Sequence, residues 1–595
     1  MNDERRKRRL RPWTVVLGLL AALLAYMYWP AGPVKIIISR QTTYITAPLN
    51  SDGTVNYVAY LDANYAKGVT PENNAAPLLL RAFGPDTLPP AITGQTLARL
   101  NLPADFFDDR DKHFIEWKHR TRPGKAGATK PSQGDDKTDA NDEDEQDSGP
   151  SLNEVYDMLL AGKVHPDLEA WLAENAGPLE LVRQATAKER FYLPLILRSN
   201  PPCMADVLVP SLQCFQQAAE ALTVQAVLKM TRNDPQGAWD DVLAAHRLAR
   251  LLDQAPTFVE QFVAVGIEGT AAKAGIALAT RGHMPPSESR ELLSKLAALR
   301  PVGRVVETID TEERFGGLDV VVMLSRPGGL RASGLSGITD RPLPDSADLD
   351  WNQMLRDMNA QYDGIVKPMR LPRFHGREEA QKASEEEFKK FETGLKGGPL
   401  SGLRLFLLKA GGRPFRKALT TAYTNILIAI MIPALGQACT MEDDARMMHE
   451  IETLAVALTC YHAENGRWPA ELKELCPSLL KTIPTDRFSV KPLIYKPGEK
   501  GYLLYSVGKN LRDDGGQREP RSDKISSAAR KDDIVAEVKP AEAASKPAQT
   551  KPADAKPAET SSRPAAISAL KNLSGKRGNV LSAVMVRALP RMARR

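Results

Sequence analysis

The sequence predicts a mainly α-helical protein with a transmembrane helix near its N-terminus and a small α+β domain near its C-terminus. An uncharged apolar run, residues 13–29, is long enough to enter a membrane. Between residues 151 and 300, apolar side chains recur at every third or fourth position, which is typical of helices with one buried face. A long helical pattern at 444–465 then precedes two short β-prone runs, so we expect a long helix packed on a small antiparallel sheet.

The chain has 595 residues, more than one hydrophobic core usually organises, so we expect several units joined by linkers. The expected order is a basic cytoplasmic stub (1–12), a transmembrane anchor (13–29), an N-terminal extracytoplasmic segment (31–123), an acidic disordered linker (124–150), a helical domain (151–338), a loop-rich connector with a charged helix (339–417), a helix-plus-hairpin domain (418–536) and a Lys-Pro-Ala-rich disordered tail with a basic end (537–595). Both disordered segments lack the apolar residues that a core needs.

The apolar run 13–29 predicts a membrane anchor. At 1.5 Å per residue it just crosses a hydrocarbon layer of about 30 Å when flanking residues are drawn in. Aromatic residues stand at both ends, and a basic cluster precedes it, so the positive-inside rule places residues 1–12 in the cytoplasm. A cleaved signal peptide is the alternative, but bulky residues stand where its cleavage site would be. We therefore expect a single-pass protein of the cell membrane with most of its chain extracytoplasmic.

The basic C-terminal tail is the second charge feature. Residues 518–595 hold 17 basic and 8 acidic side chains, whereas the whole chain has a formal charge of only +6. Such a tail suits an anionic surface, either cell-wall polymer or membrane, and it equally suits a solvated appendage. No specific nucleic-acid partner is predicted.

Local signals place the elements of the first half. Residues 34–39 have a strand pattern, and Thr70 with Pro71 predicts a helix start whose end lies at Gly84. In the helical domain, residues 233–237 separate a first long helix from a second. Residues 254–256 then separate the second from a third helix over 258–279, so we expect an antiparallel hairpin with a trailing helix.

A second uncharged run covers residues 418–441. As a membrane span following the anchor, it would put its basic flank outside and its acidic flank inside, against the positive-inside rule. We therefore expect a helix buried against the body, with a second membrane span as the alternative. The connector before it includes a predicted charged helix at 380–395.

The C-terminal domain has the most specific pattern. One helical face carries apolar side chains at Ala445, Met448, Ile451, Ala455, Leu458 and Tyr461, and Gly466 provides a left-handed stop. Two β-prone runs, 493–495 and 502–505, flank a loop at 497–501 and predict a hairpin. Such a hairpin needs the helix to cover its apolar face.

These residues resemble the major pseudopilin of type II secretion systems, a type IV pilin-like protein. Residues 461–469 follow its Y-x-x-x-x-G-R-[YW]-P motif; residues 484–488 and 491–495 resemble P-x-D-P-[FW] and N/K-P-x-x-Y, and residues 502–508 match its last strand and turn. The resemblance covers about an eighth of the chain and implies a pilin-like helix packed on a small sheet. The pilin leader and the N-terminal position of the helix are absent.

In the pseudopilin family, the loop after the last strand binds calcium through carboxylates and carbonyls. The resemblance therefore implies Asn510, Asp513, Asp514 and Asp533 as calcium ligands here, with calcium as the one possible cofactor. Arg512 would place a positive charge near the ion. A solvated acidic turn is the alternative, because aspartate and glycine are also turn formers.

The order of parts along the chain also resembles a group of uncharacterised bacterial membrane-anchored envelope proteins. Besides the anchor and the pseudopilin-like end, residues 42–46, 68–75 and 245–250 carry this resemblance. It implies an architecture and no activity.

Catalytic motifs are sparse. His449-Glu450 lacks the second histidine of H-E-x-x-H, and no phosphate-binding glycine loop is present. Cys203 and Cys214 flank a short segment, and whether they form a bridge stays open. The acidic group around Asp310 and Glu313 is more typical of structural ion pairs than of an acid and base pair.

We therefore predict a membrane-anchored extracytoplasmic structural, assembly or scaffold protein without enzymatic activity, held by residues 13–29 and contacting other envelope proteins. Two alternatives remain. One is an envelope-binding module for cell-wall polymer or a protein, and the other is a hydrolase that uses acidic residues of the helical domain.

Overall fold

The computed structural model describes residues 17–22, 34–107, 112–117, 150–197, 203–326 without 205, 206, 208 and 283, Gly329, 349–371, 416–431, 435–517 and 531–538. Its labelled helices are α2 Tyr57–Tyr65, α3 Ala76–Phe83, η1 Pro85–Thr87, α4 Pro90–Arg99, α5 Leu152–Leu160, α6 Leu168–Glu174, α7 Ala176–Thr186, α8 Leu212–Thr231, α9 Pro235–Leu252, α10 Phe258–Arg281, α11 Pro286–Ala297, α12 Val305–Thr308, η5 Ile309–Glu313, α13 Arg314–Ser325, α15 Trp351–Met369, α18 Arg416–Met431, α19 Leu435–Asn465 and η8 Leu472–Leu475. The strands are β1 Ile494–Gly498, β2 Gly501–Ser506 and β3 Ile534–Val538. The predicted fold class, mainly helical with a small antiparallel sheet, is confirmed at this level.

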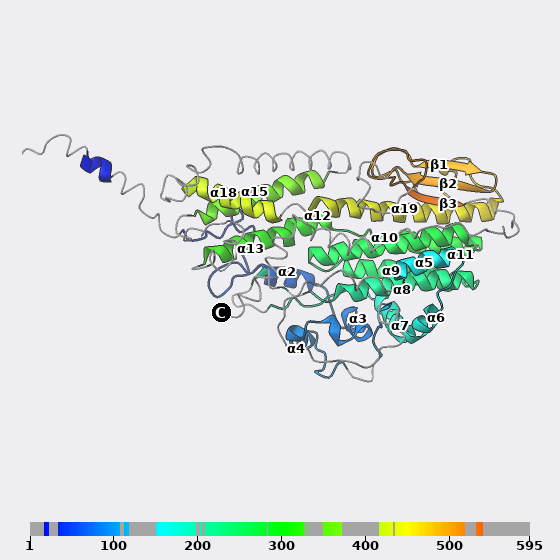
Figure 1. The fold of residues 1–595 in the computed structure, drawn as a ribbon, viewed down its shortest axis with the longest axis horizontal. Coiled ribbons are helices and arrows are strands. Elements are labelled where there is room, and N and C mark those ends of the chain that lie inside the picture. Colours follow the sequence, from blue (N-terminus) through cyan, green and yellow to red (C-terminus); the bar gives the residue numbers. More distant parts are fainter. Residues whose placement is uncertain are drawn as a thin grey trace, which may run out of the picture.

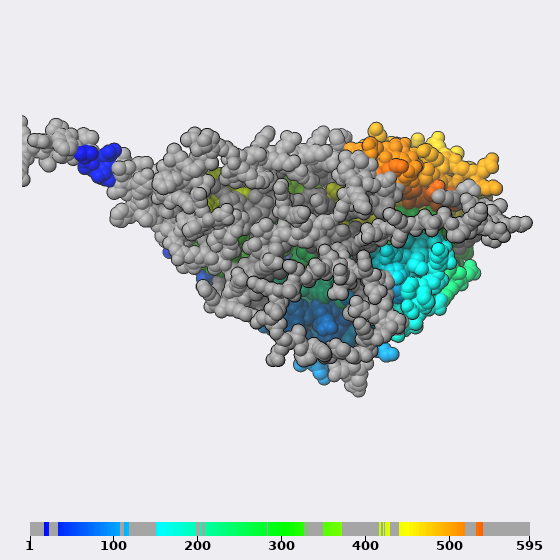
Figure 2. Space-filling view, in the orientation of Figure 1, coloured from blue at the N-terminus to red at the C-terminus, as the bar shows by residue number. Residues whose placement is uncertain are grey.

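Long helices lying side by side form the centre of the molecule (Figure 1). Helix α10 packs on α8, α9 and α19, and α11 packs on α19. Their apolar faces belong to one buried cluster that also includes side chains of α3, α5, α7 and the sheet. The C-terminal domain therefore shares a core with the helical domain. Figure 2 shows the sheet, in orange, at the same end of the molecule as the cyan segment that begins with α5.

The starts of the central helices follow from local capping. Asp234 accepts a hydrogen bond from the Gly237 amide in front of α9, and Pro235 occupies the first turn. Thr257 and Glu260 form a reciprocal capping box at the start of α10. The predicted helix breaks at 233–237 and 254–256 are confirmed.

The sheet has the order β1-β2-β3, with both pairs antiparallel. The predicted hairpin is confirmed, with a turn between Gly498 and Gly501 that is tighter than expected. Strand β3 was not predicted as a strand, and it extends to Val538, beyond the expected end of the domain at 536. It is short and joins β2 from a distant part of the chain, so no local pattern indicates it. Helix α19 packs on β2 and β3.

A second buried cluster joins α2, α13, α15 and α18. Within it, Tyr57 packs on Phe315 at a ring-centroid distance of 5.0 Å. In α18, Thr420 and Thr424 are fully buried, and α18 packs on α15. The described part of the run 418–441 therefore has the buried contacts expected of a helix held against the body.

Two local predictions are wrong. Residues 34–39 form no strand; the Ile37 amide donates instead to the Asn352 side chain at 2.7 Å. The helix predicted to start at Thr70 begins at Ala76, because Thr70 and Asn73 hydrogen-bond each other and close a turn before it. Its end at Gly84 is confirmed.

Several predicted segments lie outside the described residues: the linker 124–150 except Pro150, the charged helix 380–395, and the tail beyond 538. Of the 13–29 run, residues 17–22 are described and are helical. Within the described residues, α10 is the one helix long and apolar enough to cross a membrane, and 61% of its most apolar stretch is buried in the bundle.

Candidate functional site

Two histidines and two glutamates meet inside the helix bundle. His246 comes from α9, Glu268 from α10, and His449 and Glu452 from successive turns of α19. The side chains of His246 and Glu452 are fully buried, that of Glu268 is 2% exposed and that of His449 is 19% exposed. Ionisable side chains almost never reach this depth unless they are paired, so the cluster is a candidate site.

Close polar contacts join the four residues, which we call the His–Glu cluster. His246 lies between the two carboxylates: its Nδ1 is 2.8 Å from Glu268 Oε2 and its Nε2 is 3.0 Å from Glu452 Oε2. His449 Nδ1 lies 3.2 Å from Glu452 Oε2 and 3.5 Å from Glu268 Oε1. Both histidines therefore face both carboxylates.

Arg250, one turn after His246 on α9, orients Glu268. Its two terminal nitrogens donate to the two carboxylate oxygens at 2.7 and 3.1 Å. Its remaining donors reach the backbone oxygens of His246 and Arg300, both at 2.7 Å. This fork geometry fixes the plane of the Glu268 carboxylate.

Electrostatics in the cluster favour a cation between the carboxylates. Burial by itself lowers the pKa of His246, but Glu268 and Glu452 outweigh it and raise this pKa to about 9. Burial raises the pKa of both carboxyls, but nearby cationic groups outweigh it and hold the pKa of Glu268 and of Glu452 below the ordinary value. His246 contributes most, with His449 at both carboxyls and Arg250 at Glu268. The charges of Glu268 and Glu452 are balanced by Arg250 and a protonated His246.

Glycines let the helices approach closely at this point. A Cβ atom at Gly275 of α10 would lie 1.7 Å from Glu452 Oε1, and one at Gly269 would lie 2.9 Å from the Met448 methyl group. Gly275 thus leaves the space that the Glu452 carboxylate fills.

No local sequence pattern indicates this cluster directly, and the sequence predicts His246 only as a packed or semi-exposed helix residue. His246 and Glu452 are 206 positions apart, so only the tertiary fold brings them together. The i, i+3 spacing of His449 and Glu452 on one helix face is the one local hint.

The predicted calcium loop is brought together only in part. Asn510 Nδ2 donates to Asp514 Oδ2 at 2.7 Å, and the Gly516 amide donates to Asp533 Oδ2 at 2.8 Å. Burial, with repulsion from Asp514 as a smaller cause, raises the pKa of Asp533. Asp513 instead accepts hydrogen bonds from the Tyr505 hydroxyl and the Gly515 amide through one oxygen.

Asp533 has the property expected of a ligand. Its side chain is fully buried, and Oδ1 accepts no hydrogen bond from any described residue. A buried carboxylate oxygen without a donor is costly unless a cation or water meets it. The other three predicted ligands are engaged in hydrogen bonds. Asn510 Oδ1 accepts from the Arg512 amide, Asp514 Oδ2 accepts from Asn510 and from the Asp532 amide, and Asp513 Oδ1 accepts from Tyr505 and Gly515. Calcium binding at this loop therefore stays a prediction.

In the acidic group considered for hydrolysis, Asp310 is held in ion pairs, whereas Glu313 has no arginine partner among the described contacts. Asp310 Oδ1 lies 2.6 Å from Arg314 and its Oδ2 lies 2.6 Å from Arg370. Burial raises the pKa of Glu313 to about 7, and the Glu313 backbone oxygen accepts a hydrogen bond from Tyr362. With both its oxygens paired to arginines, Asp310 is better explained as a structural residue.

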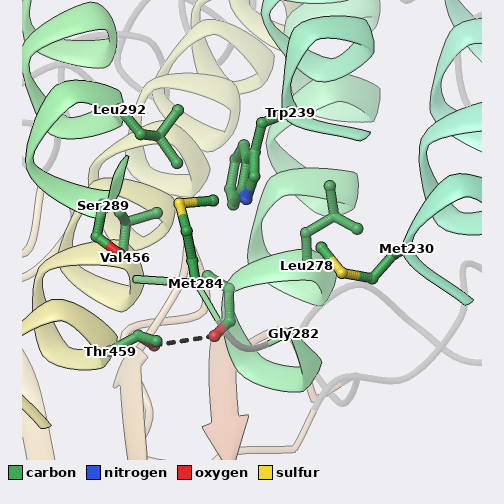
Figure 3. Close-up of a pocket in the computed structure, with 10 residues that line it drawn as sticks. Met230, Trp239, Leu278, Gly282, Met284, Ser289, Leu292, Val456 and Thr459 are labelled. Atoms are coloured by element: carbon green, nitrogen blue, oxygen red, sulfur yellow. Dashed lines mark hydrogen bonds between the residues drawn. The ribbon is translucent and has the colours of Figure 1, made fainter. Parts of the chain in front are cut away.

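Two other features of the described residues do not form a functional site. Cys203 and Cys214, both described, form no disulfide. A small pocket between α9, α10, α11 and α19 is lined mainly by apolar side chains, among them Trp239, Met284 and Leu292 (Figure 3). At the edge of the pocket, the Thr459 hydroxyl donates to the Ala279 carbonyl at 2.9 Å, so this hydroxyl already has a hydrogen-bond partner.

Comparison with family models, curated proteins and solved structures found no match to this chain.

Proposed function

We propose that this chain is a membrane-anchored structural or assembly protein of the cell envelope, with most of its residues extracytoplasmic and a pseudopilin-like C-terminal domain. The supporting observation is the position of α19. This 31-residue helix packs on the sheet and is also built into the bundle through α10 and α11. A pilin-like domain held in this way presents its strands and loops from a rigid body, as a scaffold for other proteins requires.

The anchor has support in the described part of the 13–29 run. The side chains of Leu17, Leu19 and Leu20 are 50%, 66% and 50% exposed. The short helix that carries them lies away from the body, at the far left of Figure 1. Leucines exposed in this way are expected where lipid covers them.

A topology reporter tests this proposal. A reporter fused after Val538, at the end of β3, should be active on the extracytoplasmic side, because the single anchor exports everything after it. The control fusion, placed before Met1, should report the cytoplasm. A Val538 fusion that is active only in the cytoplasm would contradict the proposal.

The scaffold role needs a second measurement. Chemical crosslinking of intact cells, followed by purification of the full chain, should recover other envelope proteins. A chain with the expected topology that crosslinks only to itself or to lipid would contradict the scaffold role while leaving the anchor in place.

A further inference from the structure

We propose that His246, Glu268 and His449 bind one divalent transition-metal ion, and that this ion fastens α19 to α9 and α10. This inference goes beyond the scaffold role, because it assigns a ligand to the interior of the bundle. Among the described residues, these three are the one set of His, Cys, Asp or Glu side chains whose ligand atoms all lie within 4.8 Å of one another.

The spacing of the ligand atoms suits a single ion. Zinc binds nitrogen and carboxylate oxygen at about 2.0–2.1 Å, so two ligands of a tetrahedral ion lie about 3.3 Å apart. The distance from Glu268 Oε2 to His246 Nδ1 is 2.8 Å, and that from Glu268 Oε1 to His449 Nδ1 is 3.5 Å. These distances run to different oxygens of Glu268, so the carboxylate binds the ion through both oxygens or turns to bring one oxygen to both histidines. His449 Nδ1 then exchanges its contact with Glu452 Oε2 for the ion.

Arg250 does not prevent Glu268 from binding an ion. Each carboxylate oxygen can accept in two directions, and Arg250 uses one direction on each oxygen. The other direction remains for a ligand on the histidine side. Because Arg250 also fixes the carboxylate plane, it pre-orients Glu268 for the ion.

Glu452 is a positioning residue in this arrangement. When Nδ1 of His246 binds an ion, Nε2 keeps its hydrogen and donates to Glu452, whose Oε2 lies 3.0 Å away. A carboxylate that accepts from the outer nitrogen fixes the tautomer and ring orientation of a metal-binding histidine. The space left by Gly275 allows Glu452 to reach this place.

The ligand types select the class of metal. Calcium and magnesium prefer oxygen ligands throughout, whereas two imidazoles with one carboxylate suit zinc, iron or manganese. Three protein ligands leave a fourth position on the ion.

Metal titration of the full-length chain in detergent tests the proposal. After removal of bound metals with a chelator, zinc should bind with a stoichiometry of one, and cobalt in its place should give visible absorption typical of a tetrahedral site. His246→Gln and His449→Gln should each weaken zinc binding by about 100-fold or more, because each removes a direct ligand. Glu452→Gln should weaken it by about 10–100-fold, as loss of an outer partner does.

His462→Gln is the matched control, because His462 lies on the same helix and stacks on Trp468 outside the cluster. It should leave zinc affinity unchanged. If His246→Gln does not fold, His449→Gln still tests the site, because His449 is partly exposed. Wild-type protein that takes up no zinc at a micromolar concentration of the free ion overturns the proposal. The cluster would then be a buried network of hydrogen bonds and ion pairs without a metal. Unchanged zinc affinity in a folded His449→Gln variant also overturns it.

Discussion

At the residue scale, the geometry of each candidate site depends on individual residues. The His–Glu cluster exists because Gly275 lacks a Cβ atom where Glu452 lies. In the segment between β2 and β3, Oδ1 of Asp533 is buried without a hydrogen-bond donor from the described residues. The sequence predicts Asp533 as a calcium ligand only through a family resemblance, and no local pattern reveals its burial.

Calcium binding at this loop is the residue-scale prediction. Calcium added to the full chain should raise its unfolding temperature, and Asp533→Asn should reduce that rise, because it removes the charge of the buried oxygen. Arg512→Ala should increase calcium affinity by removing a nearby positive charge.

Isothermal titration of each variant measures these effects. Asp444→Asn on α19, outside the loop, is the control for the loss of one acidic charge. Wild-type protein that binds no calcium at millimolar concentration would show that the loop is a solvated acidic turn.

At the element scale, Glu260 at the start of α10 and Glu313 of the π-helical turn η5 have raised pKa values and no arginine partner among the described contacts. Burial raises the pKa of Glu260 and that of Glu313 to about 7. The amide of Phe258, in the first turn of α10, donates to Glu312 of η5, so the two elements meet here. π-Helical turns are uncommon and often occur at functional sites.

Stability should therefore fall as pH rises from about 5 to 7.5. A carboxyl whose pKa is higher in the folded than in the unfolded state stabilises the fold fully below its unfolded pKa, and this contribution is lost as pH rises through the folded pKa. For Glu260, the rise from 4.5 to about 7 corresponds to roughly 3 kcal/mol at most.

Denaturant unfolding at pH 5 and pH 7.5 measures the effect. Glu260→Gln should reduce the pH dependence, because glutamine keeps the capping hydrogen bonds but cannot ionise. Glu154→Gln is the matched control, since Glu154 has the same capping-box position on the more exposed helix α5. Equal pH dependence in wild type and Glu260→Gln would contradict this assignment.

At the scale of the whole molecule, the C-terminal domain and the helical bundle form one core. Leu454, Ala457 and Leu458 of α19 are fully buried, and α19 packs on α10 and α11 as well as on the sheet. The sequence predicts them as two separate domains. The spacing of apolar residues shows that one face of a helix is apolar, but it does not show which element covers that face.

An isolated fragment of residues 435–538 should therefore not fold cooperatively. Without α10 and α11 it would expose the apolar face of α19, which the small sheet cannot cover alone. Circular dichroism on heating should show no sharp transition, and a hydrophobic dye should bind strongly. The longer fragment 34–538 keeps the bundle and the N-terminal helices packed on it, and is the control. A cooperative transition in the short fragment would show that the C-terminal domain is independent.

The sequence by itself determined the mainly helical class, the breaks between α8, α9 and α10, the apolar face of α19 and the β1–β2 hairpin. Each of these depends on residues within a few turns of one another, where periodicity, caps and turn formers act. Only the tertiary structure decided that β3 completes the sheet, that α19 joins the bundle, and that His246, Glu268 and His449 meet. These contacts join residues far apart in the chain, and such pairings depend on packing that no local pattern encodes.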